Sequence, residues 1–192
     1  MEFTLAALDL PEGWRLDDGT LTAVAPGATD LFVDPAGDPP SLSAPRALLD
    51  MAPGDWQLSA RVRVDFADTY DAGVLLVWAG DRLWAKLCFE RSPAGQPMVV
   101  SVITRGESDD ANAFTVDGGQ VWLRISRLGP AWAFHASTDG AVWQFVRHFA
   151  LGAPPTVRVG FEAQSPVGAG CTAVFDDIQF IPQRLPDLRD GS

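Results

Sequence analysis

The sequence predicts an all-β fold in which two antiparallel sheets pack face to face as a sandwich. No window of about twelve residues carries the apolar stripe of an amphipathic helix. Short runs with period-two alternation recur instead, roughly ten to thirteen of them, with turn residues about every 8–12 positions. Several runs are apolar on one face and carry Trp with charged residues on the other, which is typical of a sheet whose second face is a groove.

The N-terminal part of the chain is expected to begin with a hairpin. Residues 14–17 and 20–25 flank Asp18-Gly19, a dipeptide that favours a two-residue turn between antiparallel strands. An extended segment is expected to follow at residues 30–33, and residues 42–49 favour a strand over a helical turn.

The middle of the chain gives the clearest strands. Residues 56–66 alternate between apolar and polar side chains, which predicts a strand with one wet face. Residues 72–79 are apolar on both faces, as a central strand should be, and residues 82–91 alternate again. The remaining strands are predicted at residues 97–105, 121–128, 131–138, 142–150, 156–164 and 171–181.

Two segments are predicted to lie outside the strands. The polar run from Arg105 to Asn112 is predicted to be a surface loop, and it lacks the calcium-binding pattern of an EF-hand. Residues 182–192, with two prolines and a polar end, are expected to be a flexible tail. Residues 1–181 therefore form the single predicted domain.

Composition narrows the classes of partner. The chain has 192 residues, 47% hydrophobic and 20% charged, and a formal net charge of -11. An acidic surface repels phosphate, so neither nucleic acid nor an anionic membrane is an expected partner. No stretch reaches the ~18 apolar residues of a membrane span, and the start of the chain lacks the basic and apolar regions of a signal peptide. The two cysteines, far apart in apolar segments, are expected to be buried free thiols, and a cytoplasmic location fits these observations.

Lysine and tyrosine are each used once. Lys86 is the only lysine among fourteen basic residues, and Tyr70 is the only tyrosine beside eleven Phe and seven Trp. Coding bias or chance explains such usage, and so does a site that needs an ammonium and a phenol at these two positions, since Lys and Arg are not interchangeable at a shaped site.

Several segments together resemble a known family. They are residues 70–90 (from Tyr-Asp-Ala-Gly to Leu-Cys-Phe-Glu), Val99–Thr104, Ser108-Asp109, Ser137–Gly140 with Trp143, and Gln164–Pro166. This ordered set resembles the DUF1349 family, which includes regulation-of-enolase-like proteins and bacterial proteins encoded near polysaccharide-degradation genes. The likeness runs from about Thr29 to Phe180. It implies a jelly roll of the concanavalin A type, and it makes the run from Arg105 to Asn112 a candidate rim of a cleft. It implies no particular activity.

A candidate ligand site lies on the predicted strand 82–91. Side chains alternate along a strand, so Trp84, Lys86, Cys88 and Glu90 share one face while their neighbours face the core. An indole, an ammonium and a carboxylate in one line suit a sugar ring, which offers an apolar face and hydroxyl groups. A lysine–glutamate pair on a wet sheet face gives the same pattern.

Other strands carry similar polar faces. If residues 121–128, 131–138 and 156–164 share a sheet with 82–91, one face collects Arg124, His135, Arg158, Glu162 and Gln164 with Lys86 and Glu90. The alternative is a salt-bridged sheet exterior. With the family-like Tyr70-Asp71 pair included, the candidate ligand-binding residues are Tyr70, Asp71, Trp84, Lys86, Glu90, Arg124, His135 and Gln164.

Three functions remain open from the sequence. The first is a non-catalytic domain that binds a carbohydrate or sugar-like small molecule in the groove. The second is a protein-interaction or regulatory module with a protein partner, as the regulation-of-enolase resemblance suggests. The third is a glycoside hydrolase or lyase, but the only run near the expected carboxylate pattern is Glu107-Ser108-Asp109, so an enzyme is less favoured and no catalytic residue is assigned. Two His residues, no metal-ligand spacing and no phosphate loop predict neither a metal nor a cofactor.

Overall fold

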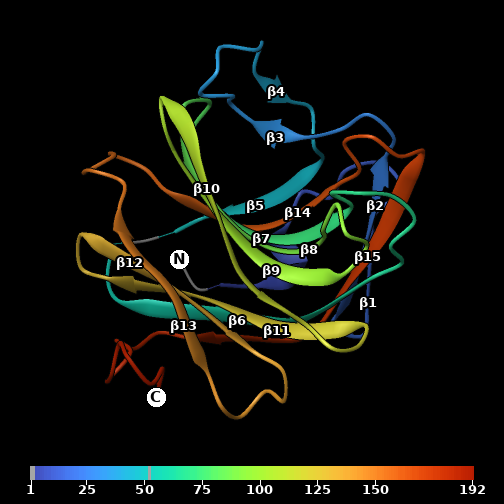
Figure 1. Ribbon diagram of the computed structural model, residues 1–192. Helices are drawn as coiled ribbons and strands as arrows, with labels where there is room; N and C mark the ends of the chain where they lie inside the picture. The colour runs from blue at the N-terminus through green and yellow to red at the C-terminus, as the bar shows by residue number, and fades with distance from the viewer. Residues whose placement is uncertain (1–2, 52) are drawn as a thin grey trace.

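The computed structural model describes residues 3–51 and 53–192. Residues 1, 2 and 52 of the predicted domain 1–181 lie outside the described residues. Within these ranges the only helical element is a three-residue 3-10 turn, η1 (Leu5–Ala7). Two antiparallel sheets lie one above the other and form a jelly-roll sandwich (Figure 1). The all-β prediction is therefore confirmed.

The first sheet has seven strands. Its order from edge to edge is β1 (Arg15–Asp17), β2 (Thr20–Pro26), β15 (Gly170–Ile181), β6 (Trp56–Val64), β11 (Gln120–Leu128), β12 (Ala131–Ser137) and β13 (Gln144–Ala150). The predicted hairpin between β1 and β2 is present, and Asp18 and Gly19 both have positive φ, as a tight two-residue turn requires.

The second sheet has six strands. Its order is β10 (Glu107–Thr115), β9 (Pro97–Arg105), β8 (Leu83–Arg91), β7 (Ala72–Gly80), β14 (Arg158–Gln164) and β5 (Arg46–Asp50). The central position predicted for residues 72–79 is confirmed, because β7 lies between β8 and β14 and seven of its nine residues are buried.

The core lies between the two sheets. Its largest fully buried side chains include Leu58, Leu87, Phe134, Phe161 and Phe175, which come from both sheets. They stand at the alternate positions that the sequence pattern assigns to the core, since a period of two places every second side chain on the buried face.

The six-stranded sheet is also apolar on part of its outer face. A short pair of strands, β3 (Leu31–Phe32) and β4 (Ser41–Leu42), lies on that side of the sheet, away from β6 and β11 (Figure 1). Leu31 packs there in a second buried cluster with Trp78 and Trp84. The pair therefore covers the part of the outer face that carries Trp78 and Trp84.

The strand β10 corrects one prediction. The run from Arg105 to Asn112 is not a loop, because its residues from Glu107 onward pair with β9 as the edge of the six-stranded sheet. Eight of the nine residues of β10 are exposed or partly exposed, and they lie on both faces. An edge strand of this kind needs no apolar face and so carries no alternating signal, while charges on it discourage pairing with other chains.

Residues 182–192, predicted as a flexible tail, pack on the outer face of the seven-stranded sheet. Leu185 is buried against Leu128 and Ala133, with Leu188 beside them. The two cysteines, Cys88 and Cys171, are both buried and free. Among the described residues, no helix has the length and apolarity to cross a membrane.

Candidate functional site

A pocket of about 240 Å³ opens on the outer face of the six-stranded sheet, beside the strand pair β3–β4. Its polar lining consists of Asp30, Lys86, Glu90, Asp110 and Gln164. Its apolar lining consists of Phe32, Tyr70, Val100, Val102 and Pro166. The volume is slightly below the roughly 300–1,000 Å³ of pockets that take drug-sized ligands, so the pocket suits a small polar molecule.

Strand register brings the central polar side chains together. Glu90 on β8 and Gln164 on β14 each lie opposite Ala72 of β7, one on either side of it. Lys86 lies on the same face of β8, four residues before Glu90. Small Ala72 leaves room between the longer side chains, so their polar ends reach the pocket.

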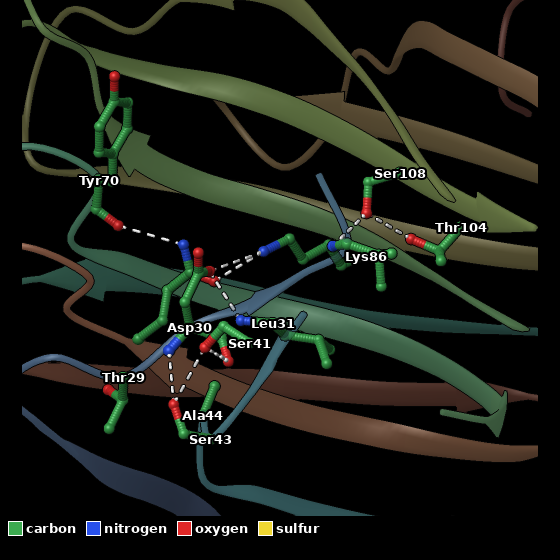
Figure 2. A network of polar contacts seen from close by, with 12 residues as sticks. Thr29, Asp30, Leu31, Ser41, Ser43, Ala44, Tyr70, Lys86, Thr104 and Ser108 are labelled. Atoms are coloured by element: carbon green, nitrogen blue, oxygen red, sulfur yellow. Dashed lines mark hydrogen bonds and ion pairs between the residues drawn. The ribbon is translucent and has the colours of Figure 1, made fainter. Parts of the chain in front are cut away.

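Lys86 is the centre of a buried polar network. Its side chain is only 2% exposed, its Nζ donates a hydrogen bond of 2.7 Å to Oε1 of Gln164, and its Nζ lies 3.6 Å from Oδ1 of Asp30. Figure 2 shows Lys86 reaching along the sheet toward Asp30, which is held from the other side by the strand pair β3–β4. The amide Nε2 of Gln164 donates in turn to the backbone oxygen of Tyr70 at 3.3 Å. The network therefore ties the sheet, the strand pair and the Tyr70 loop to one ammonium.

Asp71 fixes the loop that carries Tyr70. Its buried carboxylate accepts hydrogen bonds from the backbone N–H groups of Ala67 and Asp68 and from the hydroxyl of Ser165, at 2.9, 2.8 and 2.6 Å. Asp71 does not line the pocket. The ring of Tyr70 points away from the network (Figure 2), is 41% exposed and stands at the pocket wall. Asp71 is thus a positioning residue for the exposed ring.

Two buried carboxyl groups flank the ammonium. Burial raises the pKa of Glu162 to about 7, although Lys86 opposes the shift, and neither oxygen of Glu162 accepts a hydrogen bond from a described residue. Burial also raises the pKa of Glu90 to about 7, against the opposing effect of Lys86. Burial alone would lower the pKa of the Lys86 ammonium, but the carboxylates of Glu162, Asp30 and Glu90 outweigh burial and raise it. Lys86 therefore stays charged, while Glu162 and Glu90 titrate near neutrality.

Trp84 does not line the pocket. Its side chain is fully buried, packs with Trp78 in the outer cluster, and lies with its ring centroid 5.8 Å from Nζ of Lys86. The alternation that places Trp84 with Lys86 on one face is correct, but the strand pair β3–β4 covers that end of the strand. The aromatic rings that the pocket does expose are those of Tyr70 and Phe32.

Arg124 and His135 lie on the opposite outer face of the sandwich. The expectation that they share a sheet with Lys86 is wrong, because β11 and β12 belong to the seven-stranded sheet. There Nη2 of Arg124 donates to the backbone oxygen of Gly191 and its guanidinium stacks on Trp143, while Nε2 of His135 lies 2.9 Å from the backbone oxygen of Leu188. Burial lowers the pKa of both Arg124, to about 10, and His135. Both residues hold the C-terminal segment in place.

Sequence reasoning missed six residues of the pocket, which are Asp30, Phe32, Val100, Val102, Asp110 and Pro166. Asp30 and Phe32 come from the extended segment 30–33, whose position over the sheet no local pattern reveals. Asp110 lies on β10, in the run predicted to form the rim of a cleft. Its place beside the pocket agrees with that prediction, but the run is a strand and not a loop. Among the described residues, no cluster of three or more His, Cys, Asp or Glu side chains is arranged to hold a metal ion.

Comparison with known proteins supports the fold and gives a family. The family model described as "Protein of unknown function (DUF1349)" matches residues 8–183. No curated protein matches the sequence.

Solved structures with the same fold come from proteins of several kinds. A functionally unknown protein from Saccharomyces cerevisiae is 23% identical, with a TM-score of 0.82 over 90% of this chain and 93% of its own. The GH43 BlXynB protein from Bacillus licheniformis is 16% identical, with a TM-score of 0.74 over 88% of this chain, which spans only 34% of that protein. The carbohydrate binding module CBM66 from Bacillus subtilis is 12% identical, with a TM-score of 0.57 over 88% of this chain and 90% of its own. At these identities the likeness shows a common sandwich of the concanavalin A type.

Proposed function

The chain belongs to the DUF1349 family, and we propose that it is a non-catalytic binding domain whose pocket takes a carbohydrate or a sugar-like small molecule. One observation carries the proposal. Lys86, Glu90 and Gln164 are each at least nine-tenths buried, yet all three line an open pocket beside the exposed ring of Tyr70. Polar groups that converge on a small pocket with an aromatic wall are typical of a site for a polyhydroxylated ring.

The backbone at Tyr70 supports a role for its side chain. Tyr70 has φ of 68°, in the left-handed region that a bulky residue occupies at a cost of roughly 1–2 kcal/mol. Glycine would avoid that cost, but it would remove the ring from the pocket wall. Such an outlier at a pocket is typical of a functional position.

A glycoside hydrolase is the second candidate, and the state of Glu90 favours it. Burial raises the pKa of Glu90 to about 7, which is the range that suits a general acid, and Asp110 lines the same pocket. The ammonium of Lys86 in the same network favours binding over hydrolysis, because it stabilises the ionised form of Glu90 and so opposes the protonated form that a general acid needs.

A glycan array tests the proposal. We expect the wild-type protein to bind a defined set of glycans, and the variant Tyr70→Ala to lose that binding by about tenfold or more while it stays folded, since a stacked ring contributes about 1–2 kcal/mol. The matched control is Trp122→Ala, which removes a partly exposed ring from β11 in the other sheet.

Three other outcomes contradict the proposal. Equal loss of binding in Trp122→Ala would show that the ligand does not bind specifically in the pocket of the six-stranded sheet. Absence of any glycan signal, together with a protein that co-purifies, would favour a protein-interaction module. Turnover of a chromogenic glycoside that Glu90→Gln abolishes would favour the hydrolase.

A further inference from the structure

The charges around the pocket do not balance. Three carboxylates, those of Asp30, Glu90 and Asp110, line it, and Lys86 is its only cationic lining residue among the described residues. The Lys86 ammonium is already engaged, because it donates to Gln164 at 2.7 Å and lies 3.6 Å from Asp30. Glu90 and Asp110 are left without a hydrogen bond or an ion pair to any described residue.

Of these two carboxylates, Glu90 is the more buried. Its side chain is only 9% exposed, and the exposed part faces the pocket. A buried carboxylate normally has partners, since burial without them costs free energy. The Glu90 carboxylate therefore offers an unpaired acceptor to a donor on the ligand.

We infer that the ligand carries a protonated amino group, as an amino sugar does, and that Glu90 and Asp110 hold this group. The inference rests on the proposed function and names the class of sugar. An ammonium supplies three donors and a positive charge, and charge-assisted hydrogen bonds to carboxylates are about twice as strong as neutral ones. The hydroxyl groups of the same ring remain for Gln164, and its apolar face for Tyr70.

Two other charged ligands fit less well. A uronic acid would bring a carboxylate beside Glu90 and Asp110, and Lys86, the one cation among the described residues that line the pocket, is already paired. A divalent cation needs a shell of oxygen ligands, but the described residues form no group of three arranged for a metal, and the Lys86 ammonium lies among the carboxylates.

The titration of Glu90 supplies a second signature. Burial raises the pKa of Glu90 to about 7, and a bound ammonium favours the ionised carboxylate. Affinity for an amine should therefore fall as the pH drops below about 7, by about fivefold between pH 7 and pH 6 for one such group. A neutral sugar that hydrogen-bonds to either form of Glu90 should not show this fall.

The experiment compares three methyl glycosides, those of glucosamine, glucose and glucuronic acid, by NMR titration at about pH 6 and about pH 7. We expect the glucosaminide to bind most tightly. The variant Asp110→Asn should weaken the glucosaminide by about tenfold and leave the glucoside unchanged. Asp110 is on an exposed edge strand, so this variant should fold normally. The control Glu107→Gln removes a charge from the same strand on the face turned away from the pocket.

Each other result has a definite meaning. A glucoside that binds as tightly as the glucosaminide, or a glucuronide that binds more tightly than both, overturns the amine inference and leaves the proposed function standing. Equal weakening by Glu107→Gln assigns the effect to the general charge of the protein and overturns the inference. If none of the three sugars binds, and no glycan binds on the array, both the inference and the proposed function fail.

Discussion

Replacing Glu162 by Gln should make the protein progressively more stable than the wild type as the pH rises. Glu162 is fully buried, and neither of its oxygens accepts a hydrogen bond from a described residue. Burial raises its pKa from the ordinary value of 4.5 to about 7. Because the pKa is higher in the folded state, the stability that this group provides is fully present below pH 4.5 and is lost as the pH rises through about 7.

The magnitude follows from the two pKa values. The difference between 4.5 and about 7, at about 1.4 kcal/mol for each pKa unit, gives about 3 kcal/mol between pH 4 and pH 8. Glutamine does not ionise, so the variant lacks this loss. The unpaired amide of the new side chain costs free energy, but that cost is the same at both pH values.

Urea unfolding of both proteins at about pH 4 and about pH 8 measures the effect. The free energy of unfolding of Glu162→Gln minus that of the wild type should rise by about 3 kcal/mol over this range. The exposed control Glu107→Gln should follow the wild type, since its carboxylate is in water in both states. A difference between Glu162→Gln and the wild type that does not change with pH would refute the reasoning.

Three further predictions concern the scaffold, and each is checked by the free energy of unfolding. Asp71→Ala should cost about 3 kcal/mol because three donors lose their acceptor, whereas Ser165→Ala, which removes one of those donors, should cost about 1 kcal/mol; equal costs would contradict the account. Gly73→Ala should cost about 1–3 kcal/mol, because its new Cβ would lie 2.7 Å from a methyl carbon of the facing sheet, and Gly119→Ala, where nothing lies within 4 Å, should be near neutral. Leu185→Ala should cost about 2 kcal/mol if residues 182–192 stay packed, and no loss would show that they detach in solution.

Local pattern predicted most of the fold. Leu58, Val62 and Phe161 each stand in a run whose period of two marks the core face, and all three are fully buried. The strand β10 was not predicted, because an edge strand can be polar on both faces and then shows no alternation. The order of strands in each sheet was not predicted either, since alternation shows which face a residue occupies but not which strands are neighbours.

For the candidate site too, the sequence predicted which face a residue occupies but not which strands are neighbours. Lys86 and Glu90 share one face of the same strand through alternation, and the sequence sufficed to place both there. Arg124 is on an equivalent polar face of another strand, and only the order of strands places it on the far side of the sandwich. Asp30 reaches Lys86 through a long-range contact between segments far apart in the chain, which no local pattern encodes.

The most direct test of the pocket uses the two residue types that occur once in the sequence. Isotope labels on lysine and on the tyrosine ring give one side-chain signal each, from Lys86 and Tyr70, and both residues line the pocket. On titration with the three methyl glycosides, the account predicts that both signals shift with the same half-saturation, while the indole signal of Trp122 on the other sheet stays fixed. If Lys86 and Tyr70 remain unmoved by all three sugars, or if Trp122 responds in their place, the pocket is not the binding site.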